Sequence, residues 1–232
     1  MERTTKQKYL SAAGLLLVAT AAVKVIGAVY KIPLTGLIGG TGRGYFSTAY
    51  TLFMPVHAIT LGAFPVALSG LVSKYHATGD SARVAALQRS ARGLFFWVGL
   101  AGTALMVLLA GPYTRLVAGA PKAVYTVLIL APTALFSAMA AAHRAFAEGH
   151  LNMVPTSVCQ VLEALFKMVF GLLFAKLSMG RLYQIYLDTG MVLGNRAESE
   201  TTALSMMYPV TAACAMLGVT LGALAAWVYA AL

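Results

Sequence analysis

The sequence predicts an all-α integral membrane protein, a single membrane domain in which a bundle of six helices crosses the bilayer. Of the 232 residues, 59% are hydrophobic and only 10% are charged, whereas water-soluble domains carry about 25% charged residues. Too little polar surface remains to cover a soluble globule of this size. The composition therefore excludes a cytosolic enzyme, a nucleic-acid-binding module and a disordered tail.

Six segments are long and apolar enough to cross a hydrocarbon core about 30 Å thick, which takes roughly 20 helical residues. We expect them at residues 9–30, 45–73, 93–111, 123–142, 153–175 and 206–232. The first segment follows basic residues, as a secretory signal does, but its apolar stretch is longer than a signal and five further spans follow it. We therefore interpret it as a retained first helix of one membrane domain, residues 1–232.

Two connectors between the spans carry a structural signal. Residues 80–92 begin with the capping residue Asp80 and interleave arginines with Val84 and Leu87 at helical spacing, which predicts an interfacial helix. A solvated basic loop against anionic lipid headgroups is the competing interpretation. Residues 178–204 are the longest polar stretch, and we expect an external loop there with room for a short surface helix.

The basic residues around the first span give the orientation. Arg3, Lys6 and Lys8 precede this span, whereas Lys31 and Arg43 follow it. The connector after the second span is also richer in lysine and arginine than the connector after the third. Because basic residues accumulate in cytoplasmic loops, we predict that both termini are cytoplasmic.

A lysine lies well inside the first predicted span. Placing Lys24 near the centre of a bilayer costs about 2.5 to 3.5 kcal/mol, so we expect it to serve a function. Lys31 follows seven residues later, on nearly the same helical face, and two cations on one face suit a diphosphate. The competing interpretation is that Lys31 reaches the external headgroups before Pro33 ends the helix.

The fifth predicted span carries a polar stripe. Gln160, Glu163 and Lys167 share one helical face, and Glu163 precedes Lys167 by four residues, the favourable order for a pair. We predict an internal ion pair that either holds helices together or is broken by ligand or proton during transport. His57, in the second span, either supplies another polar group to the same cavity or is a packing residue.

Two glycine patterns have competing interpretations. Residues 40–44 superficially resemble a phosphate-binding loop, but no strand precedes them and no Lys-Ser/Thr follows, so we expect a flexible turn between helices. Gly218 and Gly222 form a GxxxG pattern, which allows another backbone to approach closely. We favour packing within the bundle over dimerisation.

The chain offers no pattern that indicates an enzyme. Its four histidines form no metal-ligand array, and no Ser/His/Asp set or carboxylate pair shares a plausible cleft. Cys159 and Cys214 lie isolated in apolar runs, where they are expected to pack as small hydrophobic residues. We therefore expect no catalysis, no cofactor and no metal.

Several strings together resemble one family. Residues 24–34 and 39–45 read KVIGAVYKIPL and GGTGRGY, and they resemble the first span and first turn of the stage V sporulation protein B branch of the oligosaccharidyl-lipid flippases. Residues 143–156 read HRAFAEGHLNMVPT and resemble that family's junction between spans four and five. Residues 62–65 and 73–75 fit the end of its second span. The resemblance extends over nearly the whole chain.

This resemblance implies a bacterial cytoplasmic membrane transporter of the multidrug, oligosaccharidyl-lipid and polysaccharide superfamily. Such a flippase exports an undecaprenyl-diphosphate-linked sugar, a precursor of the cell wall or spore cortex, by alternating access between two lobes around a cationic cavity. Lys24 and Lys31 fall at or near its cavity cations, and His57 lies where some relatives have an arginine. With Lys167, these are the expected substrate-binding residues.

The number of predicted spans limits the resemblance to an amino-terminal lobe. A second lobe or a second copy of the chain is therefore an expected partner, beside the lipid bilayer and the lipid-linked sugar. Two other functions stay open. One is a cation-coupled multidrug antiporter with Glu163 as its ion or proton site, and the other is a non-transporting membrane assembly partner.

Overall fold

The computed structural model describes the backbone of residues 2–232 and the side chains of residues 14–232. Arg3, Lys6 and Lys8, which carry part of the orientation argument, lie outside the described side chains. The helices are, in chain order, α1 (Glu2–Leu61), α2 (Phe64–Ala77), α3 (Ser81–Pro112), η1 (Tyr113–Val117), η2 (Pro121–Ala123), α4 (Val124–Leu130), α5 (Thr133–Gly149), α6 (Val154–Thr189) and α7 (Glu200–Ala231). A hairpin of β1 (Met191–Val192) and β2 (Asn195–Arg196) joins α6 to α7.

Five helical stretches are long and apolar enough to cross a membrane: Gly14–Ala77, Ser81–Val117, Pro121–Gly149, Val154–Thr189 and Glu200–Ala231. The predicted all-α membrane class is therefore confirmed. The first stretch has 64 residues, about three times the length that one crossing needs. A break in its direction accounts for this excess.

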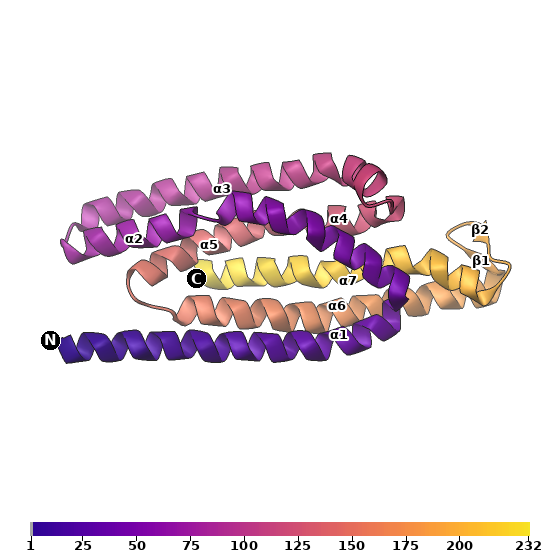
Figure 1. Cartoon of the computed structure of the whole chain (residues 1–232), viewed down its shortest axis with the longest axis horizontal. Coiled ribbons are helices and arrows are strands. Elements are labelled where there is room, and N and C mark those ends of the chain that lie inside the picture. The colour runs from indigo at the N-terminus through magenta and orange to yellow at the C-terminus, as the bar shows by residue number, and fades with distance from the viewer. Residues whose placement is uncertain (1) are drawn as a thin grey trace.

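That break lies at Gly39, inside α1. Its backbone angles, φ 63° and ψ −177°, belong to a region that essentially only glycine adopts. Figure 1 shows the chain turning back here, so that α1 has a first limb (residues 2–38) and a second limb (residues 40–61) that leads into α2. Residues 40–44, expected to be a flexible turn, are instead the helical start of the second limb. A single residue makes the turn.

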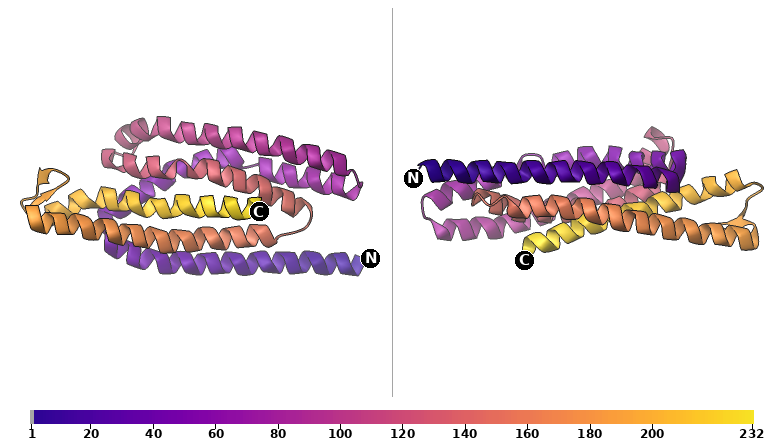
Figure 2. Two further views of the ribbon diagram at one scale, coloured as in Figure 1. Left: turned by 180° about the vertical axis from the view of Figure 1, so that it is seen from behind. Right: turned by 90° about the horizontal axis from the view of Figure 1, so that it is seen from below.

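The helices form an elongated bundle. The first limb of α1 and α6 lie side by side along one edge, and α3 forms the opposite edge (Figures 1 and 2). The first limb keeps an outward apolar face, in which Val25 is 64% exposed and Ile32 is 79% exposed. Such a face suits contact with lipid tails.

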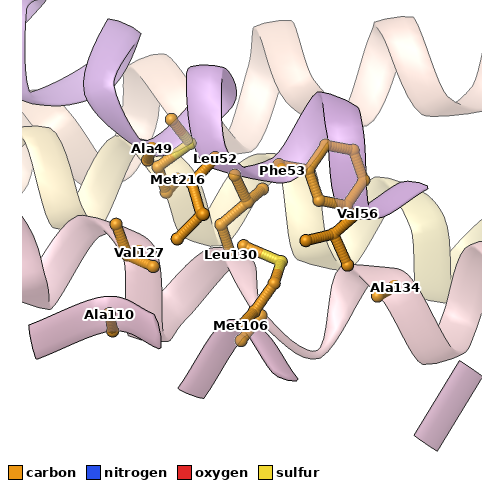
Figure 3. Close-up of a cluster of buried hydrophobic side chains, with 11 residues drawn as sticks. Ala49, Leu52, Phe53, Val56, Met106, Ala110, Val127, Leu130, Ala134 and Met216 are labelled. Atoms are coloured by element: carbon orange, nitrogen blue, oxygen red, sulfur yellow. The ribbon is translucent and has the colours of Figure 1, made fainter. Parts of the chain in front are cut away.

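A buried apolar cluster fixes the second limb of α1 against the interior (Figure 3). Its members come from the second limb and from α3, α4, α5, α7 and the α4–α5 junction: Ala49, Leu52, Phe53, Val56, Met106, Ala110, Val127, Leu130, Ala131, Ala134 and Met216. Lipid tails are as apolar as leucine, so close packing rather than removal from water holds such a cluster together. The packing orients the neighbouring face of the limb toward α6.

The two connectors are both largely helical. Asp80 caps α3 as predicted, accepting a hydrogen bond from the backbone N–H of Arg83 at 3.0 Å, and residues 81–92 form a helix that continues without a break into the apolar part of α3. Residues 178–204 comprise the end of α6, the β1–β2 hairpin and the start of α7. The left-handed Gly190 ends α6 (φ 66°), so the polar stretch is mainly helical rather than a loop.

The GxxxG pattern packs inside the bundle, as predicted. A Cβ atom at Gly218 would overlap the backbone of Gly171 in α6, and a Cβ atom at Gly222 would lie 2.9 Å from the carbonyl oxygen of Glu163. Glycine therefore lets the backbones of α6 and α7 touch at the level of the polar stripe.

Replacing Gly39 with alanine is expected to lower the free energy of unfolding by about 1 to 3 kcal/mol, because alanine avoids this backbone region. Its Cβ would also lie 2.8 Å from Cζ of Tyr208. Thermal unfolding in detergent micelles measures the change. Gly40→Ala is the matched control, since its Cβ would meet no atom within 4 Å. Equal unfolding temperatures for the two variants would contradict the role of Gly39.

Gly218→Val should separate α6 from α7 and cost about 1 to 3 kcal/mol of stability through overpacking. The same unfolding assay applies. Gly70→Val introduces an identical change at a position with open space around it and should have a much smaller effect. A normal monomer stability combined with loss of a dimer would show instead that the glycines serve dimerisation.

Candidate functional site

Two cavities adjoin each other between the limbs of α1 and α6. The cationic cavity has a volume of about 410 Å³ and includes Lys24, Lys31, Arg43 and Lys167 in its lining. The polar cavity, of about 300 Å³, lies among α1, α5, α6 and α7, and its polar lining residues are Tyr30, Tyr50, His57, Thr133, Ser137, Gln160, Glu163 and Lys167. Both volumes fall within the usual range for ligand pockets or at its lower limit.

The first limb of α1 supplies two of the four cations. Its helix continues through Pro33 to Ile38, so the expectation that Pro33 ends the helix is wrong. Proline is tolerated here within a longer helix, as it is in membrane helices where neighbouring groups satisfy the freed carbonyl. Lys24 and Lys31 therefore stay on one helical face, and both residues are exposed and line the cationic cavity.

Arg43 joins these lysines, although the sequence pattern places it in a turn between helices and indicates no role in the site. The reversal at Gly39 brings the start of the second limb back toward the end of the first, so that Arg43 and Lys31 line one cavity. A predicted helix at residues 40–44, in place of a turn, would have put Arg43 in the first turn of a helix.

Lys167 lies at the boundary and lines both cavities. Its ammonium group donates a hydrogen bond of 2.9 Å to the hydroxyl oxygen of Tyr50. It also lies 4.8 Å from the ring centroid of Tyr50, 5.4 Å from that of Tyr30 and 5.7 Å from that of Phe46. The distances to Tyr30 and Phe46 are within the range of cation–π attraction, whereas the ammonium meets Tyr50 at its hydroxyl group.

Glu163 has a different ion-pair partner from the predicted one. Its carboxylate lies 3.6 Å from the guanidinium of Arg144, whereas Lys167 binds Tyr50. The predicted Glu163–Lys167 pair is therefore corrected. Arg144 lies between the predicted fourth and fifth spans, residues 123–142 and 153–175, but α5 continues to Gly149 and includes it.

Two residues that line the polar cavity each carry a buried polar atom without a partner. In the described part of the chain, neither the hydroxyl of Tyr30 nor Nδ1 of His57 has a hydrogen-bond partner. Unpaired buried groups of this kind call for a water molecule or a ligand. His57 packs against Phe53, with ring centroids 5.0 Å apart and the rings tilted by 30°, and it lines the polar cavity with Gln160. The expected substrate residues thus divide between two adjoining cavities.

Comparison with known proteins identifies the family. The family described as "Polysaccharide biosynthesis protein" matches residues 10–188, which include the first limb of α1 from residue 10 onward, the whole second limb and all the cations of the site. The chain belongs to this polysaccharide biosynthesis protein family.

Two curated relatives come from Bacillus subtilis (strain 168). The chain is 28% identical to "Lipid II flippase MurJ" over 174 residues, covering 70% of this chain and 31% of that protein. It is 25% identical to "Stage V sporulation protein B" over 158 residues, covering 68% of this chain and 30% of that protein. The chain therefore spans about a third of the length of these relatives. No solved structure matches it.

The family assignment and the apolar helices together identify the chain as a multi-pass membrane protein. The resemblance noted from the motifs in residues 24–45 and 143–156 is confirmed by these matches. Most of the motif residues lie in helices that line or adjoin the two cavities.

Double-mutant cycles should separate the two possible partners of Glu163 in this family member. The interaction energy between Glu163→Gln and Arg144→Met is expected to be about 0.5 to 3 kcal/mol. The lower half of this range is favoured because the side chains are 36% and 19% exposed. The cycle of Glu163→Gln with Lys167→Met should give a smaller value. Both interaction energies are measured by thermal unfolding. A larger interaction energy for Glu163 with Lys167 than for Glu163 with Arg144 would show that Lys167 is the partner of Glu163.

Proposed function

We propose that the chain forms one lobe of a flippase for an undecaprenyl-diphosphate-linked sugar, a precursor of cell-wall or spore-cortex polysaccharide. The single observation that carries the proposal is the cationic cavity, where Lys24, Lys31, Arg43 and Lys167 converge from both limbs of α1 and from α6. A diphosphate is the anionic group that such a set of ammonium and guanidinium donors binds well.

The polar cavity suits the sugar part of the same ligand. Gln160 and Ser137, which line this cavity, can hydrogen-bond sugar hydroxyls. Because Lys167 lines both cavities, a ligand with its diphosphate in the cationic cavity can place its first sugar in the polar cavity. Binding and reorientation of this ligand require no covalent chemistry.

The path of the chain supports a lobe with six crossings. Five stretches can span the membrane, and the first of them turns back at Gly39, which adds one crossing to the five. An even number places both termini on one side, and the basic residues that flank the first crossing favour the cytoplasmic side. Alternating access would then be completed by a second lobe or a second copy of the chain.

The names of the relatives favour a flippase, since one is called a lipid II flippase. A cation-coupled antiporter would need Glu163 as its ion site, but Arg144 already neutralises this carboxylate at 3.6 Å. A non-transporting assembly partner would have no need for four cations around one cavity. The charges of the site thus support the flippase over both alternatives.

Lys24→Ala should weaken binding of undecaprenyl diphosphate about tenfold, because a charge-assisted hydrogen bond is lost. The measurement is titration of the 232-residue chain in nanodiscs of uncharged lipid. Lys122→Ala is the matched control, since it removes the same charge from η2, away from both cavities. Equal affinity for the wild type and Lys24→Ala would overturn the proposed function.

A further inference from the structure

The surroundings of Lys167 form a binding site in their own right. Tyr30 comes from the first limb of α1, and Phe46 and Tyr50 come from the second limb. Their three ring centroids lie 4.8 to 5.7 Å from the Lys167 ammonium nitrogen. The rings also contact one another, with centroids 6.4 Å apart for Tyr30 and Phe46 and 5.3 Å apart for Phe46 and Tyr50. We call Tyr30, Phe46 and Tyr50 the aromatic cage.

Aromatic cages are receptors for organic ammonium ions, because the negative faces of several rings surround one cation. Here the chain supplies the cation itself. We propose that the aromatic cage is a cation-binding site that Lys167 fills from within the chain, and that this occupancy excludes organic ammonium ions from the two cavities. Lys167 is then a specificity-determining residue.

The other charges near the cage explain why such an occupant is needed. Glu163 lines the polar cavity one helical turn from Lys167, and a carboxylate beside an empty aromatic cage would complete an attractive site for an organic cation. Arg144 is paired with this carboxylate, while the ammonium of Lys167 is held by the rings and by the Tyr50 hydroxyl. Both cation-attracting features of the cavities are thereby occupied by side chains of the protein.

Tethering makes this occupancy effective. A side chain attached to α6 meets the cage at a high effective concentration, which a free cation must outcompete. The cage borders both cavities through Tyr30 and Lys167, so its occupant controls the charge seen from each of them. This inference goes beyond the proposed flippase function, because the exclusion of cations does not require that a diphosphate binds.

Binding of radiolabelled tetramethylammonium to the purified chain tests the proposal. Lys167→Ala should bind the probe saturably and at least about tenfold more tightly than the wild type, whose binding should be weak or not saturable. Tetramethylammonium carries the same single positive charge as the Lys167 side chain that the variant lacks. The other cations of the cavity therefore repel the bound probe no more than they repel Lys167 in the wild type. Equal binding, or no binding, by both proteins would overturn the proposal.

Three further variants sharpen the result. Lys167→Arg keeps a cation in the cage and should reject the probe as the wild type does. Adding Tyr50→Leu to Lys167→Ala removes the ring that lies nearest the ammonium and should abolish the gained binding. Lys167→Ser should gain binding as Lys167→Ala does, and it covers the case in which the alanine variant does not fold. Retained binding without the Tyr50 ring would show that the cage is not the site.

Lys24→Ala separates this proposal from the flippase proposal. Lys24 lines the cationic cavity but is not part of the aromatic cage. The variant should therefore lose diphosphate affinity while still rejecting tetramethylammonium. Suppose that Lys24→Ala binds diphosphate as tightly as the wild type does, and that Lys167→Ala gains cation binding. The flippase proposal would then be rejected, and the proposal that Lys167 fills the aromatic cage would stand.

Discussion

The backbone conformation of Gly39 is the constraint on which the site depends. With φ 63° and ψ −177°, it turns one long apolar helix back on itself within a single residue, against the ring of Tyr208. The two limbs then contribute to the same walls: Lys31 and Arg43 line one cavity, and the rings of Tyr30 and Phe46 come within 6.4 Å. A wider turn would separate these groups and open the aromatic cage.

Charge pairing then divides the space between the limbs and α6 into two environments. Glu163, the acidic residue of the polar cavity, is neutralised by Arg144 from α5. Within residues 14–232, the ion pairs are Arg83–Asp80 and Arg144–Glu163, so the cations of the cationic cavity have no acidic partner in the described part of the chain. The cationic cavity therefore keeps its positive charge, whereas the polar cavity shares Lys167 with it and is otherwise lined by a neutralised carboxylate and uncharged polar groups.

Much of this arrangement was predictable from local patterns. A lysine inside an apolar segment is energetically costly, so Lys24 could be identified as a functional candidate. The spacing of seven residues places Lys31 on the same helical face. The same kind of reasoning failed for Glu163, because the i,i+4 spacing to Lys167 describes only one helix. Arg144 approaches from α5, and Tyr50 attracts Lys167 from α1. Competition between partners on different helices is not visible in the spacing along one of them.

The sequence by itself determined that the chain is helical and membrane-spanning, where the apolar segments lie, and that positive charge is placed within them. These properties follow from composition and from the 3.6-residue period, which act locally. Only the tertiary structure decided that Gly39 reverses the chain, that Arg43 joins the lysines, and that three ring centroids lie 4.8 to 5.7 Å from the Lys167 ammonium. Those outcomes depend on which helical faces meet, and that is fixed by packing between segments far apart in the chain.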